Sequence, residues 1–261
     1  MKETVDILGI KFENIRKSDA EKRITDALER RNYMSIFTPN PDIVLGTYGS
    51  AELTKLINSA ELTVPDGIGI ILASRLLGAP LPERIAGIDL GEFILKQADY
   101  RGLRIFLLGG KQGVAQRAEK KITEKYPHLT VCGTHHGYFD KDGMENERIV
   151  EKIRILSPDV LFVCFGFPEQ ERWIESNHSA IPSLKICAGL GGSIDVWAGD
   201  TRRAPKAIQS IGAEWLWRMV LQPKRAKNIL RIPEFLLCVA KQKRSQFKKS
   251  RSYEKVKRDK L

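Results

Sequence analysis

The sequence predicts an α/β fold, with a mainly parallel sheet covered by helices on both faces and a helical, basic appendage at the C-terminal end. Through the first 210 residues, short apolar runs alternate with longer stretches of helical periodicity. Several of those runs end in turns rich in glycine or proline, directly before a helical stretch. The excess of positive charge lies almost entirely in the last 47 residues, which sets them apart from the rest.

Seven apolar runs have the length and composition of buried strands. They are Thr4–Ile10, Met34–Thr38, Leu62–Val64, Arg104–Leu108, Leu129–Gly133, Val160–Phe165 and Leu184–Leu190. Helices are predicted between them, at Ser18–Arg31, Asp42–Asn58, Gly67–Leu77, Ile88–Tyr100, Gly113–Tyr126, Glu145–Leu156 and Glu169–His178. Ser18 and Glu21 have the spacing of a capping box for the first helix. In such a fold, ligands bind at the carboxyl ends of the strands.

The chain of 261 residues can hold one substantial α/β domain and an appendage. We assign residues 1–199 to the α/β domain and 200–261 to the appendage, with 241–261 a candidate for disorder. No apolar run is long enough to span a membrane and the N-terminus lacks a signal-peptide pattern, so we expect a cytoplasmic protein. The four cysteines have no paired spacing, which favours reduced thiols over a disulfide framework or a zinc site.

Residues 215–261 contain 15 Lys and Arg against three acidic residues, whereas the rest of the chain is nearly neutral. Within the appendage, the apolar stretches 215–221 and 229–240 lie beside basic residues. This pattern is typical of a helix that lies on an anionic membrane surface. A nucleic-acid partner is not expected, because the core is nearly neutral and contains no recognised nucleic-acid motif.

Glycine-rich turns follow the predicted strands at Gly109-Gly110 and Gly191-Gly192. Glycine lets the backbone approach a ligand closely, and Ser193 to Trp197 have the composition of a helix start. We therefore expect free N–H groups here that could hold a phosphate. The alternative is that each pair only forms a tight strand-to-helix turn. The spacing is not that of a dinucleotide fingerprint, so a nicotinamide cofactor is not predicted.

Asp66 lies between Pro65 and Gly67 at the end of a predicted strand and is the first candidate for a general base. The alternative role is an N-cap for the helix that begins near Gly67. Thr38 and Asn40, in a Thr-Pro-Asn-Pro turn, suit hydrogen bonds to sugar hydroxyls or an N-acetyl group, or else simply form the turn.

At three further positions the sequence shows a polar side chain but leaves its role undecided. Arg84 could neutralise a diphosphate or pair with Glu83 on the surface. Gln170 starts a helix after Pro168 and could contact a sugar or a base. The motif Asp140-Lys-Asp142 matches the D-x-D that many sugar-nucleotide transferases use for a metal ion, but its polar surroundings favour a loop, and no metal site is predicted.

Several motifs, in order along most of the chain, resemble the WecG/TagA/CpsF family of bacterial glycosyltransferases, and its TagA branch most closely. They are TPNPDIV, VPDGIGI with ERIAGIDL, RIFLLGGKQGVAQRA, GYF, PDVLFVCFGFPEQE, and AGLGGSIDVWAGDTRRAP with EWLWRMVLQPKR. The resemblance implies a Rossmann-like domain and inverting transfer of N-acetylmannosamine from UDP to N-acetylglucosamine on undecaprenyl diphosphate, in wall teichoic acid synthesis. The alternative within the family is another UDP-sugar, N-acetylmannosaminuronic acid or glucose, and another lipid-linked acceptor.

The resemblance also implies roles for particular residues. Asp66 matches the proposed base, and the matches to proposed pocket residues are Thr38, Asn40, Arg84 and Gln170. Arg218 and Arg225, in the appendage, would reach the diphosphate. No cofactor or metal is implied. The appendage would hold the protein on the inner face of the cell membrane, and a homo-oligomer is left open.

Overall fold

The computed structural model describes residues 3–30, 32–210, 214, 217 and 231–258. A six-stranded parallel sheet forms the centre of this part of the chain, in the order β4-β3-β8-β7-β5-β6. The strands are β3 (Met34–Phe37), β4 (Leu62–Thr63), β5 (Arg104–Gly109), β6 (Thr130–His135), β7 (Val160–Cys164) and β8 (Ile186–Gly189). The predicted α/β class and parallel sheet are confirmed, and all six strands of the sheet lie within or next to predicted ones.

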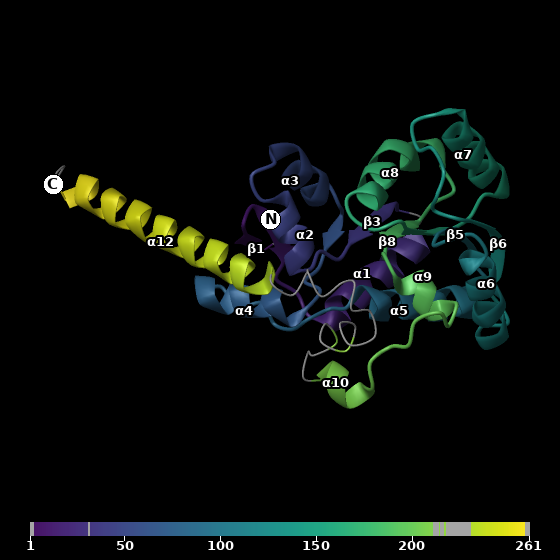
Figure 1. Cartoon of the computed structure of the whole chain (residues 1–261), viewed down its shortest axis with the longest axis horizontal. Helices are drawn as coiled ribbons and strands as arrows, with labels where there is room; N and C mark the ends of the chain where they lie inside the picture. Colours follow the sequence, from purple (N-terminus) through teal and green to yellow (C-terminus); the bar gives the residue numbers. More distant parts are fainter. Residues whose placement is uncertain (1–2, 31, 211–213, 215–216, 218–230, 259–261) are drawn as a thin grey trace.

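Helices cover both faces of the sheet, as predicted (Figure 1). One face packs against α1 (Lys17–Arg30), α5 (Gly87–Arg101), α6 (Val114–Lys125) and the short α9 (Ser193–Trp197). The other packs against α2 (Pro41–Thr47), α3 (Ala51–Asn58), α4 (Ile68–Leu77), α7 (Met144–Leu156) and α8 (Glu169–Asn177). In β5, Ile105 and Leu107 face the first layer while Phe106 and Leu108 face the second, so the strand is apolar throughout. A 3₁₀ turn (His178–Ala180) follows α8, and α10 (Lys206–Ser210) follows α9.

Three local predictions are wrong. Thr4–Ile10 is not one strand: β1 (Thr4–Ile7) and β2 (Ile10–Glu13) form a separate antiparallel hairpin, which turns at Leu8 and Gly9 with positive φ. Asp42–Asn58 is two helices, α2 and α3, separated at Gly49, whose φ is +87°. The first helix begins at Lys17, so Ser18 is not its cap; the carboxylate of Asp19 accepts the N–H of Arg16 instead.

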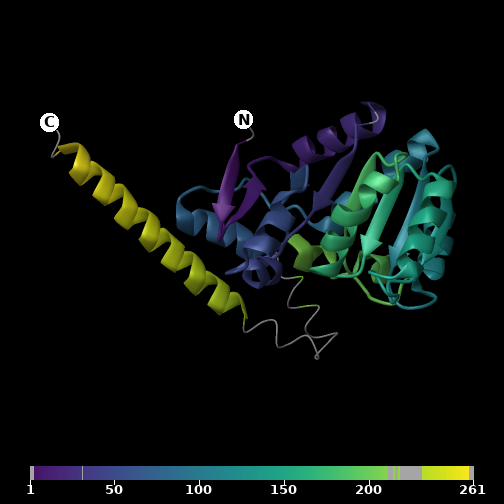
Figure 2. The same ribbon diagram turned by 90° about the horizontal axis from the view of Figure 1, so that it is seen from above.

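The C-terminal helix α12 (Arg231–Arg258) packs on α2 and α4 through its first half. Phe235 and Val239 are fully buried there, and the Gln242 amide bonds to the backbone of Asp6 and Leu8 in the hairpin. These two apolar side chains therefore dock the appendage on the core and are not part of a membrane-facing surface. The far end of α12 projects from the body (Figure 2). The helix continues through residues 241–258, which belong to the stretch 241–261 that the sequence marked as a candidate for disorder.

No helix within the described ranges is both long enough and apolar enough to cross a lipid bilayer.

Candidate active site

The carboxyl ends of the strands carry two neighbouring groups of polar side chains. One group follows β3 and β4 and contains Thr38, Asn40 and Asp66. The other follows β5, β6, β7 and β8 and lines a cavity of about 800 Å³. The two groups meet at β3 and β8, which are neighbours in the sheet and therefore about 4.8 Å apart, while β4 and the strands β7, β5 and β6 lie further out on either side.

The half-buried carboxylate of Asp66 lies between three chain segments. Its backbone N–H donates to Pro39 O at 3.3 Å, and the N–H of Gly87 donates to its Oδ2 at 3.4 Å. The predicted alternative, an N-cap of α4, is wrong, since Gly67 and not Asp66 occupies the N-cap position of that helix. Asp66 is therefore held at the strand end by the turns around it, as a general base must be.

Thr38 and Asn40 lie beside Asp66 but differ in their roles. The Thr38 side chain packs against Gly87, where an added Cβ would come within 2.6 Å of Thr38 Oγ1. Asn40 caps α2, because its Oδ1 accepts the N–H groups of Asp42 and Ile43 at 3.0 and 3.1 Å. The turn-forming alternative is confirmed for the Asn40 oxygen, which leaves the Asn40 amide as the group that could contact a sugar.

Arg84 does not pair with Glu83, whose carboxylate instead accepts the N–H of Lys17. The Arg84 Nη1 atom lies 2.5 Å from Glu214 Oε2, and both side chains are largely buried. Since Glu214 belongs to the appendage, this ion pair joins the appendage to the segment that contacts Asp66. Arg218 and Arg225, which the resemblance assigns to the diphosphate, lie outside the described residues.

Gln170 joins the loops that follow β7 and β8. Its Oε1 accepts the N–H of Gly191 at 2.9 Å and the N–H of Gly166 at 3.3 Å, and its Nε2 donates to Glu171 Oε1 at 2.8 Å. Gln170 itself is buried. In this structure the Gln170 amide thus holds two of the loops that line the cavity.

The glycine turns present fewer free N–H groups than predicted. The Gly191 N–H bonds to Gln170, the Ser193 N–H to Leu190 O, and the Gly110 N–H to Cys164 O. At Gly109 an added Cβ would lie 2.4 Å from Cys164 O, so this glycine allows the ends of β5 and β7 to approach each other. These three N–H groups are therefore not free to hold a phosphate in this structure, and the prediction of a phosphate site at the glycine turns rests on the remaining ones.

The cavity is formed by residues from the ends of β5, β6, β7 and β8. The predicted Gly110, Gly191 and Gly192 line it, and Gly109 directly precedes Gly110. Its other lining residues are Lys111, Gly137, Tyr138, Phe139, Asp140, Lys141, Glu145, Cys164, Phe165, Gly166, Glu169 and Asp195. None of the polar side chains that fill it was a predicted ligand-binding residue.

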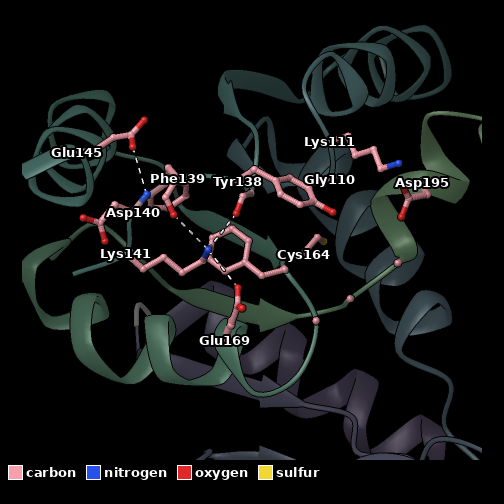
Figure 3. A pocket seen from close by; sticks show the side chains of 15 residues that line it. Gly110, Lys111, Tyr138, Phe139, Asp140, Lys141, Glu145, Cys164, Glu169 and Asp195 are labelled. Atoms are coloured by element: carbon pink, nitrogen blue, oxygen red, sulfur yellow. Dashed lines mark hydrogen bonds and ion pairs between the residues drawn. The ribbon is translucent and has the colours of Figure 1, made fainter. Parts of the chain in front are cut away.

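Three of these side chains have complementary chemistry. Tyr138 is 71% exposed, so the face of its ring is accessible for stacking on a ligand in the cavity. The Lys111 ammonium makes no ion pair with any described residue, and Asp195 supplies a carboxylate. Figure 3 shows the Tyr138 and Lys111 side chains reaching toward the side of the cavity where Asp195 lies. A π-face, a cation and a hydroxyl acceptor together match a base, a phosphate and a ribose.

Lys141 forms part of the cavity wall opposite Asp195 (Figure 3). Its Nζ donates to Gly137 O at 3.0 Å, pairs with Glu169 at 3.1 Å and lies 4.8 Å from the centre of the Phe165 ring. The predicted loop at Asp140-Lys-Asp142 is confirmed, with Asp140 Oδ1 accepting the Asp142 N–H. Among the residues that the structure describes, no three His, Cys, Asp or Glu side chains gather as a metal site would require.

The fold and these sequence motifs together define a glycosyltransferase. The chain belongs to the glycosyl transferase WecG/TagA/CpsF family, whose model matches residues 5–249, and the resemblance seen in the sequence is confirmed. Among its relatives is the N-acetylglucosaminyldiphosphoundecaprenol N-acetyl-beta-D-mannosaminyltransferase of Staphylococcus aureus strain MRSA252, which is 37% identical over 242 residues, covering 92% of this chain and 93% of the relative. The proteins of the same name from strains NCTC 8325 and COL are 36% identical over the same coverage.

Proposed function

We propose that this protein transfers N-acetylmannosamine from UDP to N-acetylglucosamine carried on undecaprenyl diphosphate, with inversion, in the linkage unit of wall teichoic acid. The names of its Staphylococcus aureus relatives describe this sugar and this acceptor. The observation that carries the proposal is that Asp66, after β4, lies at the same edge of the sheet as a cavity with the chemistry of a nucleotide site, with only β3 between β4 and β8, the nearest strand of that cavity.

The donor nucleotide occupies the cavity after β5, β6, β7 and β8. Tyr138 stacks on the uracil ring, Asp195 accepts a ribose hydroxyl, and Lys111 neutralises phosphate charge. The sugar then extends across β8 toward β3, where Thr38 and the amide of Asn40 contact its polar groups. This direction is supported by the sheet order, in which β8 is the immediate neighbour of β3.

The transfer is a single displacement at the anomeric carbon. Asp66 takes the proton from the 4-hydroxyl of the acceptor sugar as that oxygen forms the new glycosidic bond. The bond between the anomeric carbon and the β-phosphate oxygen breaks, and UDP leaves with the bonding electrons. Attack from the face opposite UDP converts an α-linked donor into a β-linked product. Cationic side chains supply the charge for the leaving diphosphate, so the reaction proceeds without a metal ion.

The appendage places the enzyme beside its lipid-linked acceptor. Basic residues crowd the end of α12, and each one near an anionic surface contributes on the order of 1 kcal/mol to binding. The protein accordingly acts as a peripheral enzyme on the inner face of the cell membrane.

The test is release of UDP by the full-length chain from UDP-N-acetylmannosamine and a lipid-linked N-acetylglucosamine diphosphate, with and without EDTA. Turnover that resists EDTA supports the donor, the acceptor and the metal-free reaction together. Turnover lost with EDTA and restored by Mg²⁺ would overturn the metal-free step. Turnover only with UDP-N-acetylmannosaminuronic acid or UDP-glucose would mean that this other UDP-sugar, and not UDP-N-acetylmannosamine, is the donor. Loss of activity in Asp66→Asn, with UDP binding retained, assigns the base.

A further inference from the structure

Four charged side chains form a chain of ion pairs, in the order Arg84, Glu214, Arg203 and Asp89, where the appendage meets the core. Arg84 Nη1 lies 2.5 Å from Glu214 Oε2, and Arg203 Nε lies 3.3 Å from the other oxygen of the same carboxylate. Arg203 Nη2 also lies 2.6 Å from Asp89 Oδ1. The Glu214 carboxylate thus bridges two guanidinium groups, as a phosphate group would.

The network lies next to the proposed base. The segment that carries Arg84 is bound to the segment that carries Asp66, with the Ile85 N–H donating to Pro65 O at 2.9 Å and the Gly87 N–H to Asp66 Oδ2 at 3.4 Å. Asp89 lies in the first turn of the helix that begins at Gly87. An anion held by Arg84 would therefore lie near the reacting groups.

The network has no net charge while Glu214 is in place. Two arginines face two carboxylates, and Glu214 is only 6% exposed. Burial alone raises the pKa of Glu214, but the hydrogen bond and charge of Arg84, together with Arg203, outweigh burial and hold that pKa below its ordinary value. Glu214 is thus an anion near neutral pH, and a diphosphate that approaches Arg84 meets a site whose positive charge is already neutralised.

We propose that Arg84 and Arg203 form a diphosphate subsite that Glu214 occupies in the free enzyme, and that the diphosphate of a substrate displaces the Glu214 carboxylate. This inference rests on the proposed function, which requires a diphosphate near Asp66. Release of Glu214 breaks its ion pairs with Arg84 and Arg203, so binding of the diphosphate and movement of Glu214 are coupled. In the free enzyme, the Glu214 carboxylate competes with anions for Arg84 and Arg203 and so lowers the affinity of the enzyme for anions.

The primary test is the affinity for inorganic pyrophosphate, measured by calorimetry on the full-length chain. If the site is open in about a tenth of the free molecules, removing the competitor tightens the apparent affinity about tenfold. Glu214→Gln should show that gain, and adding Arg84→Gln to it should abolish the gain. Glu92→Gln is the matched control, because Glu92 bridges Lys125, Tyr126 and Trp197 in a joint away from the strand ends, and it should leave the affinity unchanged.

Unchanged or weaker pyrophosphate binding by folded Glu214→Gln would overturn the proposal and leave Glu214 as a structural joint only. A second measurement needs no variant at Glu214. Trp217 lies three residues after Glu214, so displacement should change its fluorescence when pyrophosphate binds, and the change should be absent in Trp217→Phe. No change at saturating pyrophosphate would also contradict the inference.

Two ligands distinguish the source of the diphosphate. A gain in affinity for UDP assigns the subsite to the donor nucleotide, and a gain for a short-chain prenyl diphosphate assigns it to the lipid acceptor. All of these measurements report binding and not sugar transfer. A wild-type protein that transfers no sugar would contradict the proposed function, whereas the pyrophosphate affinities would still test the subsite.

Discussion

Glu171 is a buried carboxyl group whose ionisation should make stability depend on pH. It is 2% exposed, its Oε1 accepts the Gln170 amide, and its Oε2 has no hydrogen-bond partner among the described residues. Burial, only partly offset by the Gln170 hydrogen bond, raises the pKa of Glu171 from 4.5 to about 7. The perturbation that isolates this effect is Glu171→Gln, which keeps an oxygen acceptor for Gln170 but cannot ionise.

The sign and size of the effect follow from proton linkage. Between pH 4.5 and about 7 the unfolded chain has lost the Glu171 proton while the folded protein keeps it. The unfolded state therefore binds fewer protons, and the stability of the wild type falls as pH rises through this window. At about 1.4 kcal/mol per pH unit, the whole window costs about 3 kcal/mol relative to Glu171→Gln. Below the window both states are protonated, and above it the full cost is present.

The assay is urea unfolding of both proteins at several pH values from about 5 to 8. The difference in unfolding free energy should shift in favour of Glu171→Gln by about 3 kcal/mol across the range, or about 6–12 °C in melting temperature for a chain of this size. Glu169→Gln is the control, since that exposed carboxylate should change stability by less than about 1 kcal/mol at any pH. A difference between wild type and Glu171→Gln that stays constant with pH would refute the reasoning.

Three further outcomes are expected. Asp66→Asn should lower the turnover rate by about 10²–10⁴-fold while the Kd for UDP stays unchanged, as measured by UDP release and calorimetry; near-normal turnover would remove Asp66 as the base. Tyr138→Leu should weaken UDP binding by about 1–3 kcal/mol through loss of stacking, whereas Tyr48→Leu, at another exposed tyrosine, should not. Phe235→Ala should destabilise the protein by about 3–5 kcal/mol in thermal unfolding, and Leu237→Ala, which is 65% exposed on the same helix, by less than about 0.5 kcal/mol.

The sheet could be predicted from the sequence because each of its strands is a short apolar run closed by a turn signal. The hairpin could not, because Thr4–Ile10 is a single run and its turn begins at Leu8, a residue that rarely adopts positive φ. Likewise, Asp42–Asn58 contains two glycines, Gly46 and Gly49, and the sequence does not show which of them breaks the helix; Gly46 lies within α2, whereas Gly49 separates α2 from α3.

From the sequence, residues of the candidate site could be predicted only where a single turn contains the polar side chain and the turn-forming residues that hold it. Asp66 stands in such a turn; the structure places Gly67 in the N-cap position of the next helix, so Asp66 is not that cap, and its role as base stays a prediction. Lys111 and Tyr138 come from the loops after β5 and β6, and Asp195 from the short helix α9 after β8, and only the order β8-β7-β5-β6 brings these three segments together. The available signal was that each of the three lies within a few residues of the end of a predicted strand.

The ion pair between Arg84 and Glu214 could not be predicted from the sequence either, because 130 residues separate the two in the chain and no local pattern relates them. It also bears on how anions could bind at this end of the sheet. Three backbone N–H groups at the glycine turns are bonded within the protein. Lys111 makes no ion pair with the described residues, whereas Arg84 is paired with Glu214. Under the proposed displacement of Glu214, a phosphate can reach Lys111 in the resting protein, whereas the site beside Asp66 gains positive charge only after Glu214 has left Arg84.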